Sequence, residues 1–179
     1  MSSLTINSNK FYNDAVEKTA KELNITNIMA APRVAKVAIN IGMGKYDNKV
    51  KQEIIGYLEK LTGQKPKAIK SRVSVAGFKL RKNELVACQV TLRGKAAQDF
   101  IVSLVFLGLP RTRDFRGIKS TSFDKNYSTY SVGIESTSIF PAVGFDTGFN
   151  FGMQVNVAFT TPSENNIELL KNLNFPFKK

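Results

Sequence analysis

Three separate segments of the chain alternate apolar and polar residues with a period of two, and this feature constrains the fold most strongly. Residues 34–41 place Val37, Ile39 and Ile41 on one side and Lys36 and Asn40 on the other. Residues 85–93 and 152–161 repeat the pattern. Successive side chains of a strand point to opposite faces, so each segment predicts a strand with one buried and one polar face.

Segments with helical spacing separate these strands. Apolar residues recur every three or four positions in residues 8–23, 50–61 and 95–107. A last helix is expected after Pro162, with Ser163 as its N-cap. Gly63 stands where a left-handed C-cap would end the second helix, and short strands are expected at 66–70 and 127–134.

This order of elements predicts an α+β fold. One apolar face per strand fits a two-layer sandwich with a mixed, mostly antiparallel sheet, helices on one face and the other face open. The 179 residues are expected to form a single domain, 1–179, with 72–84 as a basic projecting loop. Cys88 falls on the apolar face of its strand and is expected in the core.

Charge is distributed unevenly along the chain, whose formal net charge is +12. Residues 60–82 hold eight basic and no acidic residues, whereas 126–165 contain no Lys or Arg. A field of this sign favours polyanions, nucleic acid first and an anionic membrane surface second. Polar strand positions such as Lys36 and Asn40, about 13 Å apart at 3.3 Å per residue, suit a nucleic-acid backbone, although an ordinary solvated sheet face shows the same pattern.

The acid-free stretch contains the sequence SVAGFK, residues 74–79, between two basic clusters. Its small residues allow close approach of a partner, and Phe78 offers a stacking surface beside Lys79 and Arg81. The segment therefore favours a basic loop that contacts RNA over a solvated lysine-rich loop. A second cluster, PRTRDFRG, carries Arg111, Arg113 and Arg116; these guanidinium groups suit phosphate contacts, but Asp114 could equally pair with one of them.

Several classes of protein are excluded or disfavoured. The chain has no His and one Cys, which excludes His-dependent catalytic triads, His-ligated zinc and an internal disulfide. The turn at Gly42 and Gly44 lacks the third glycine of a dinucleotide-binding fingerprint, because position 47 is Asp. No catalytic residue, metal site or cofactor is expected. The N-terminus lacks a signal-peptide pattern, and an intracellular protein is expected.

Six motifs resemble those of a known family in order and spacing. They are APRVAKVAINIGMG (31–44), LTGQKP (61–66), SVAGFKLR (74–81), VTLRG (90–94), LPRTRDFRGI (109–118) and FPFKK (175–179). With them the chain resembles, over nearly its whole length, the bacterial-type large ribosomal subunit protein five family.

The resemblance implies a non-enzymatic ribosomal protein in the cytoplasm that binds 5S ribosomal RNA and attaches it in the central protuberance. Further implied partners are large-subunit rRNA, P-site transfer RNA, small-subunit protein thirteen across an intersubunit bridge, and neighbouring central-protuberance proteins; no membrane is involved. The family's 5S-binding positions fall on Lys36, Asn40, Gln64, Thr91 and Arg93. Its tRNA-contacting loop falls on Ser74, Val75, Ala76, Gly77, Phe78, Lys79, Leu80, Arg81 and Lys82.

Two segments depart from the family pattern. FDKNYSTY (123–130) lacks the usual glycines, and DTGFNFG (146–152) lacks basic residues. Both lie outside the 5S-binding motifs and bear on the intersubunit contact instead. Two competing hypotheses are a polyanion-binding module at a membrane surface, which needs a basic amphipathic helix, and a magnesium-dependent nucleic-acid enzyme, which needs a carboxylate cluster.

Overall fold

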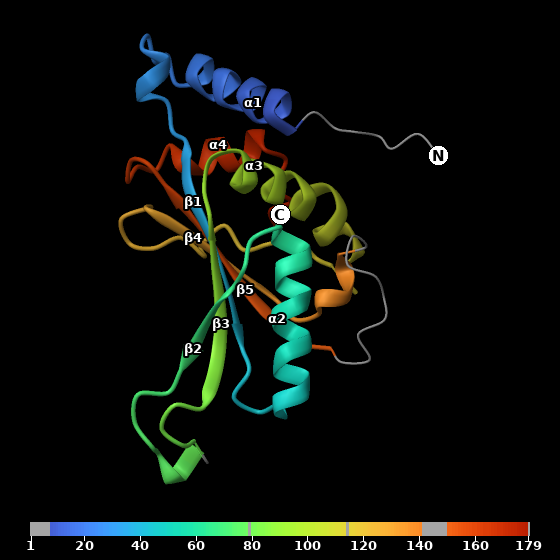
Figure 1. Cartoon of the computed structure of the whole chain (residues 1–179). Coiled ribbons are helices and arrows are strands. Elements are labelled where there is room, and N and C mark those ends of the chain that lie inside the picture. The colour runs from blue at the N-terminus through green and yellow to red at the C-terminus, as the bar shows by residue number, and fades with distance from the viewer. Residues whose placement is uncertain (1–7, 79, 114, 141–149, 179) are drawn as a thin grey trace. The chain divides into compact units, whose positions relative to one another are not determined.

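The structure is a computed structural model that describes residues 8–78, 80–113, 115–140 and 150–178. Its strands form one five-stranded antiparallel sheet in the order β2-β3-β1-β5-β4 (Figure 1). With the four α-helices, this sheet confirms the α+β class. The strands are β1 (Val34–Gly42), β2 (Lys67–Lys70), β3 (Leu85–Leu92), β4 (Thr129–Ile134) and β5 (Met153–Phe159). The helices are α1 (Ser8–Glu22), α2 (Asn48–Thr62), α3 (Gly94–Ser103) and α4 (Asn166–Asn172).

The predicted elements are found with small shifts at their ends. Gly63 adopts the expected left-handed C-cap, with φ 66°, and its N–H donates to the Glu59 carbonyl at 2.8 Å. The third helix does not run regularly to residue 107, because α3 passes into a π-helical turn, η3 (Leu104–Gly108). The last helix begins at Asn166 with Asn165 as N-cap, so the prediction of Ser163 as N-cap was wrong. The Ser163 hydroxyl instead accepts from the Asn165 N–H at 3.3 Å.

Contacts divide the chain into two compact units. The first unit comprises Met1–Val37, Leu92–Val132 and Asn156–Lys179, and the second unit comprises Ala38–Thr91 and Gly133–Val155. Each unit is discontinuous in sequence, because β1, β3, β4 and β5 each begin in one unit and end in the other.

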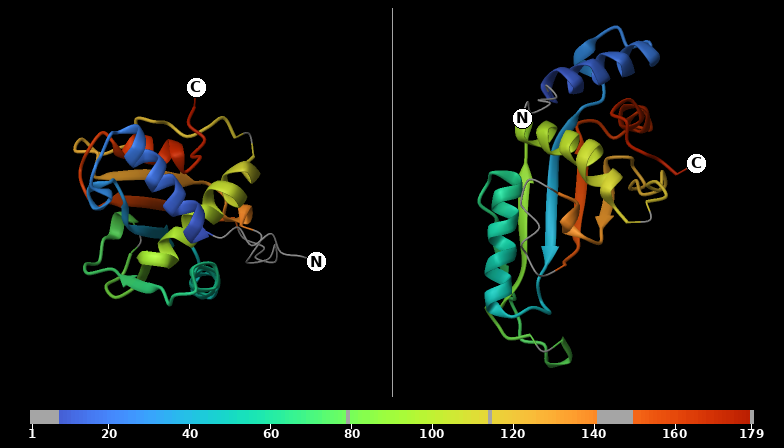
Figure 2. Two further views of the ribbon diagram at one scale, coloured as in Figure 1. Left: turned by 90° about the horizontal axis from the view of Figure 1, so that it is seen from above. Right: turned by 90° about the vertical axis from the view of Figure 1, so that its right-hand side faces the viewer.

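In the second unit, α2 lies along one face of the strands (Figures 1 and 2). The strand residues Ile39, Ile41 and Cys88 and the helix residue Leu58 are all 0% exposed. Full burial of one such aliphatic side chain contributes about 1.5–3 kcal/mol, so this face is the core of the unit. Cys88 is the core residue that the alternation predicted, and burial raises the pKa of its thiol to about 11.

In the first unit, α1 contacts both α3 and α4. The Asn172 carboxamide on α4 donates to Thr19 Oγ1 at 3.0 Å and to Glu22 Oε2 at 2.7 Å on α1. At the other end of α1, the Ser8 hydroxyl donates to Asp99 of α3. Polar contacts therefore fix α1 between the two later helices.

The C-terminal segment packs on Gly117 in the first unit. Gly117 has φ 89°, and a Cβ on it would lie 2.8 Å from the Cα of Lys178. Beside it, the Ile118 N–H donates to the Pro176 carbonyl at 2.8 Å, and the Lys178 N–H donates to the Ile118 carbonyl at 2.9 Å. Only glycine permits this close passage of two backbone segments.

Candidate nucleic-acid interface

Polar side chains occupy the strand positions opposite the core of the second unit. Asn40 on β1 is exposed, and Gln89 and Thr91 on β3 are half-buried. Lys67 on β2 lies directly opposite Gln89 in the antiparallel register and shares its face. We call Asn40, Lys67, Gln89 and Thr91 the polar face of the second unit; it presents amide, hydroxyl and ammonium groups on three neighbouring strands.

The remaining predicted 5S-binding residues lie at element ends or in the first unit. Gln64 follows the C-cap of α2, is exposed, and donates its N–H to Thr62 Oγ1 at 3.3 Å. Lys36 on β1 and Arg93 belong to the first unit and are exposed. Arg93 is the N-cap of α3, with extended φ −138°, and follows the last residue of β3. Asn40, Gln64 and Thr91 thus share one unit, while Lys36 and Arg93 share the other.

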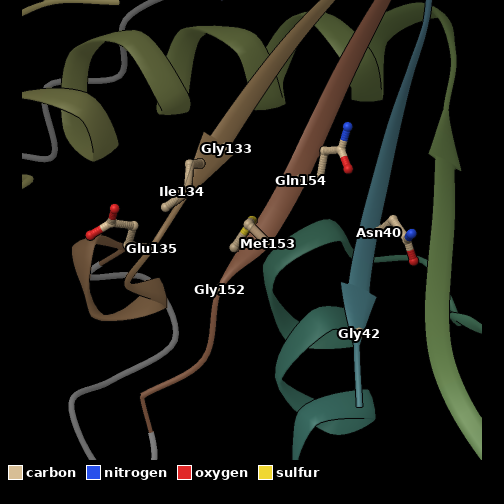
Figure 3. A pocket seen from close by; sticks show the side chains of 8 residues that line it. All are labelled: Asn40, Gly42, Gly133, Ile134, Glu135, Gly152, Met153 and Gln154. Atoms are coloured by element: carbon tan, nitrogen blue, oxygen red, sulfur yellow. The ribbon is translucent and has the colours of Figure 1, made fainter. Parts of the chain in front are cut away.

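A pocket of about 480 Å³ opens in the second unit on β1, β5 and β4 (Figure 3). Its lining includes three glycines, Gly42, Gly133 and Gly152, together with the polar side chains of Asn40 and Gln154 and the carboxylate of Glu135. Asn40 belongs both to the pocket lining and to the polar face, so the pocket adjoins that face. The period-two pattern of residues 152–161 places Gln154 on the polar face of the last strand. Glu135 lies just beyond β4, and no sequence pattern indicated a role for it.

The chain between β2 and β3 forms a hairpin extension of the second unit (Figure 1). Val75 and Leu80 exchange backbone hydrogen bonds at 3.1 and 3.2 Å around the short helix η2 (Ala76–Phe78). The Lys82 N–H donates to the Ser74 hydroxyl at 2.9 Å. The tip exposes apolar side chains: Phe78 is 77% exposed, Val73 65% and Val75 40%. Lys79 lies outside the described residues.

The base of this hairpin is held to α2 by an ion pair. Lys51 Nζ lies 3.2 Å from Glu84 Oε1, and Lys51 is 2% exposed. The Arg81 N–H donates to the other carboxylate oxygen of Glu84 at 3.0 Å. This backbone hydrogen bond, followed by that from Lys51, lowers the pKa of Glu84 below its usual value. Glu84 therefore carries a negative charge at neutral pH and ties the hairpin base to the helix.

The arginine cluster lies in the first unit. Arg111, Arg113 and Arg116 are all exposed, with Arg111 ending the short helix η4 (Leu109–Arg111). Asp114, the alternative partner for these arginines, lies outside the described residues, as does most of the atypical segment 146–152. None of the described helices combines the length and the apolar character needed to span a membrane.

Comparison with known proteins identifies the family of the chain. A family model described as "Ribosomal protein L5" matches residues 27–81, and a second model, which describes the C-terminus of the same ribosomal protein family, matches residues 85–177. The large ribosomal subunit protein uL5 of Buchnera aphidicola subsp. Schizaphis graminum is 40% identical over 168 residues, which cover 92% of this chain and 93% of that protein.

Two further relatives show the same extent of similarity. The uL5 proteins of Mycoplasma mycoides subsp. mycoides SC and Dichelobacter nodosus are 40% and 39% identical over 176 residues. These alignments cover 95% and 94% of this chain and 96% and 97% of the relatives. Both halves of the chain match family models, and the relatives match over more than nine-tenths of each chain, so the chain belongs to the ribosomal protein L5 family.

Proposed function

We propose that the polar face of the second unit, together with Gln64, Lys36 and Arg93, binds 5S ribosomal RNA and attaches it in the central protuberance. As a member of the ribosomal protein L5 family, the chain is a structural protein of the large ribosomal subunit and not an enzyme. Its place of action is the ribosome in the bacterial cytoplasm.

One observation supports the RNA-binding role above the others: hydrogen-bonding side chains lie on the outward face of the second unit, opposite its fully buried inward face. The inward positions Ile39, Ile41 and Cys88 are 0% exposed, and the outward positions between them carry Asn40, Gln89 and Thr91. The outward groups donate and accept hydrogen bonds, which suits the phosphates, 2′-hydroxyls and base edges of RNA. The +12 net charge adds attraction that does not depend on sequence.

The test is a binding titration of 5S rRNA beside an unrelated structured RNA of similar length, from about 50 to 200 mM salt, over which purely ionic binding falls steeply. We expect the preference for 5S rRNA to survive at the higher salt. Asn40→Ala should weaken 5S binding by about tenfold, since one good contact is worth about 1–3 kcal/mol. Asn126→Ala, an exposed asparagine in the first unit, is the matched control. An equal loss of affinity for both RNAs as the salt concentration rises would refute specific binding by the free protein.

A second proposed contact is that of the hairpin, residues 74–82, with P-site transfer RNA. Its support is the 77% exposure of Phe78 beside Arg81 and Lys82, because an exposed aromatic ring among cations suits base stacking. Replacing Arg81 and Lys82 with Gln should spare 5S binding, since neither lies on the polar face. A loss equal to that of Asn40→Ala would contradict this separation of roles.

The remaining proposed partners are large-subunit rRNA, neighbouring central-protuberance proteins and small-subunit protein thirteen. Arg111, Arg113 and Arg116 are exposed and available for RNA or protein contacts. Residues 126–165 carry acidic and no basic side chains, which suits a basic protein partner. Crosslinking from these two segments in assembled ribosomes tests the assignment.

A further inference from the structure

Two glycines in the strands of the second unit have no reason inside the protein to be glycine. Gly42 ends β1 and Gly133 lies in β4, and neither has a positive φ. A Cβ on either would meet no atom within 4 Å. Glycine within a strand weakens it and often marks a place where a ligand approaches the backbone closely. By contrast, Gly152 has an internal reason, because its Cβ would lie 3.1 Å from the Ile134 carbonyl oxygen.

These glycines lie together in the pocket of about 480 Å³ on β1, β5 and β4 (Figure 3). β1, β5 and β4 are neighbours in the sheet in that order, and Gly42 at the end of β1, Gly152 just before β5 and Gly133 in β4 leave backbone without side chains in one pocket. A surface without side chains admits a flat group that lies against it. Around this surface stand the carboxamides of Asn40 and Gln154 and the carboxylate of Glu135.

The carboxylate of Glu135 determines which kind of planar ligand the pocket can bind. A carboxylate only accepts hydrogen bonds, and it repels the phosphates that the rest of this basic protein attracts. Among the described residues no Lys or Arg forms an ion pair with it. The charge therefore suits a neutral partner that presents two adjacent donors, one to each oxygen. Among the RNA bases, the Watson–Crick edge of guanine has this pattern in its N1–H and N2–H groups, whereas adenine, cytosine and uracil each present a single donor position there.

Resting on the proposed binding of RNA, we propose that this pocket receives one unpaired guanine of the bound RNA. Its ring lies against the backbone at Gly152, between Gly42 and Gly133 on the two flanking strands, and its N1–H and N2–H donate to the Glu135 carboxylate. The carboxamides of Asn40 and Gln154 contact the remaining edge and the sugar. Sequence-specific RNA recognition commonly uses unstacked bases in this way.

The decisive test is the sign of the effect of removing one negative charge. On electrostatics alone, Glu→Gln on a protein that binds RNA strengthens binding slightly. We expect this from Glu164→Gln, an exposed glutamate of the first unit, as the matched control. Glu135→Gln should instead weaken 5S rRNA binding by about tenfold or more, because it replaces one acceptor with a donor facing a donor. Strengthened or unchanged binding by Glu135→Gln would overturn the proposal.

A chemical footprint identifies the base. Kethoxal modifies the N1 and N2 positions of unpaired guanine, so the wild-type complex with 5S rRNA should protect one guanine that becomes reactive in the Glu135→Gln complex. All other protections should remain. The guanine proposal fails, and the proposed function stands, if no guanine is protected in the wild-type complex and reactive in the Glu135→Gln complex while 5S rRNA still binds in preference to the unrelated RNA. If the preference itself is absent, the proposed function fails.

Gly133→Ala separates binding from folding. The added methyl group meets nothing in the protein, so the thermal midpoint should be unchanged or raised. It does occupy the surface on which the base would lie, and the affinity for 5S rRNA should fall several-fold. Gly56→Ala on α2, whose Cβ also meets nothing within 4 Å, is the control that should leave RNA affinity unchanged. Unchanged affinity in Gly133→Ala would contradict the proposal.

Discussion

Lys51 Nζ lies 3.2 Å from Glu84 Oε1, and the two side chains differ in exposure, at 2% for the lysine and 31% for the glutamate. Removing the lysine and removing the glutamate should therefore reduce the stability of the fold by different amounts. Lys51→Met leaves a partly hydrated carboxylate that keeps its hydrogen bond from Arg81, whereas Glu84→Gln leaves a buried ammonium without its counter-charge. We expect Glu84→Gln to lower the urea midpoint more than Lys51→Met does. The reverse order would show that the lysine is hydrated in solution.

The same pair makes stability depend on pH. The pKa of Glu84 is lowered in the folded protein, first by the Arg81 N–H and then by Lys51, so the unfolded chain binds the proton more readily. The contribution of this pair is present above the usual glutamate pKa of 4.5 and is lost as the pH falls through the lower folded value. Urea unfolding between pH 3 and 6 should show the gap between wild type and Glu84→Gln closing toward the acid end.

Gly117 is expected to tolerate no side chain. Its φ of 89° is strained for alanine, and the Cβ would overlap the backbone of Lys178 at 2.8 Å. We expect Gly117→Ala to destabilise the protein by about 2–4 kcal/mol, from strain and overpacking together. Gly56→Ala within α2 should stabilise by about 0.5–1 kcal/mol through helix propensity. Thermal unfolding of both variants checks these opposite signs.

Tyr57 on α2 connects the two chain segments of the second unit. Its hydroxyl donates to the Thr137 carbonyl at 2.5 Å, and its ring lies edge-on to Phe151 at 5.2 Å. Tyr57→Phe keeps the ring contact and removes one of two hydrogen bonds to the Thr137 carbonyl, which still accepts from the Phe140 N–H at 3.3 Å. The loss should cost about 0.5–1.5 kcal/mol at neutral pH.

Tyr57 also predicts a loss of stability in alkali. Burial raises its pKa from 10 to about 12, so the neutral form stabilises the fold fully below pH 10, and this contribution is lost as the pH rises toward 12. Tyr57→Phe should therefore lose stability less steeply between pH 10 and 12 than wild type. Parallel curves would contradict the assignment. Tyr130, whose pKa burial also raises to about 12, titrates equally in both proteins.

Phe78 at the hairpin tip should matter for RNA and not for folding. Since its side chain is 77% exposed, Phe78→Ala should change stability by less than about 0.5 kcal/mol. If it stacks on a base of P-site tRNA, its loss should weaken that contact by about 1–3 kcal/mol. The measurement is tRNA dissociation from ribosomes carrying the variant. Leu107→Ala, also at an exposed apolar position (43%), should leave the rate unchanged.

Cys88 should be chemically silent in the folded protein. It is 0% exposed, and burial raises its pKa to about 11, so the reactive thiolate is scarce at pH 8. We expect a thiol reagent to react only after denaturation. Reaction of the native protein at the rate of a free thiol would show that β3 opens readily.

The sequence predicts most of the framework, because periodicity reports which face of a segment is buried. The strand pattern correctly separated Ile39 and Cys88 from Asn40 and Thr91, and Gly63 was found by its cap chemistry. What sequence could not predict depends on contacts between distant segments. Examples are the burial of Lys51 against Glu84, the meeting of Gly117 with Lys178, and the gathering of Gly42, Gly133 and Glu135 around one pocket.

Because the two units are interleaved, neither folds from one continuous stretch of the chain. The first unit joins Met1–Val37 to Asn156–Lys179, and the second joins Ala38–Thr91 to Gly133–Val155, so each unit must close long loops. Contacts between segments far apart in the sequence, such as Thr19 with Asn172, form only after these loops have closed. We therefore expect folding to be slow compared with that of a protein built from local contacts.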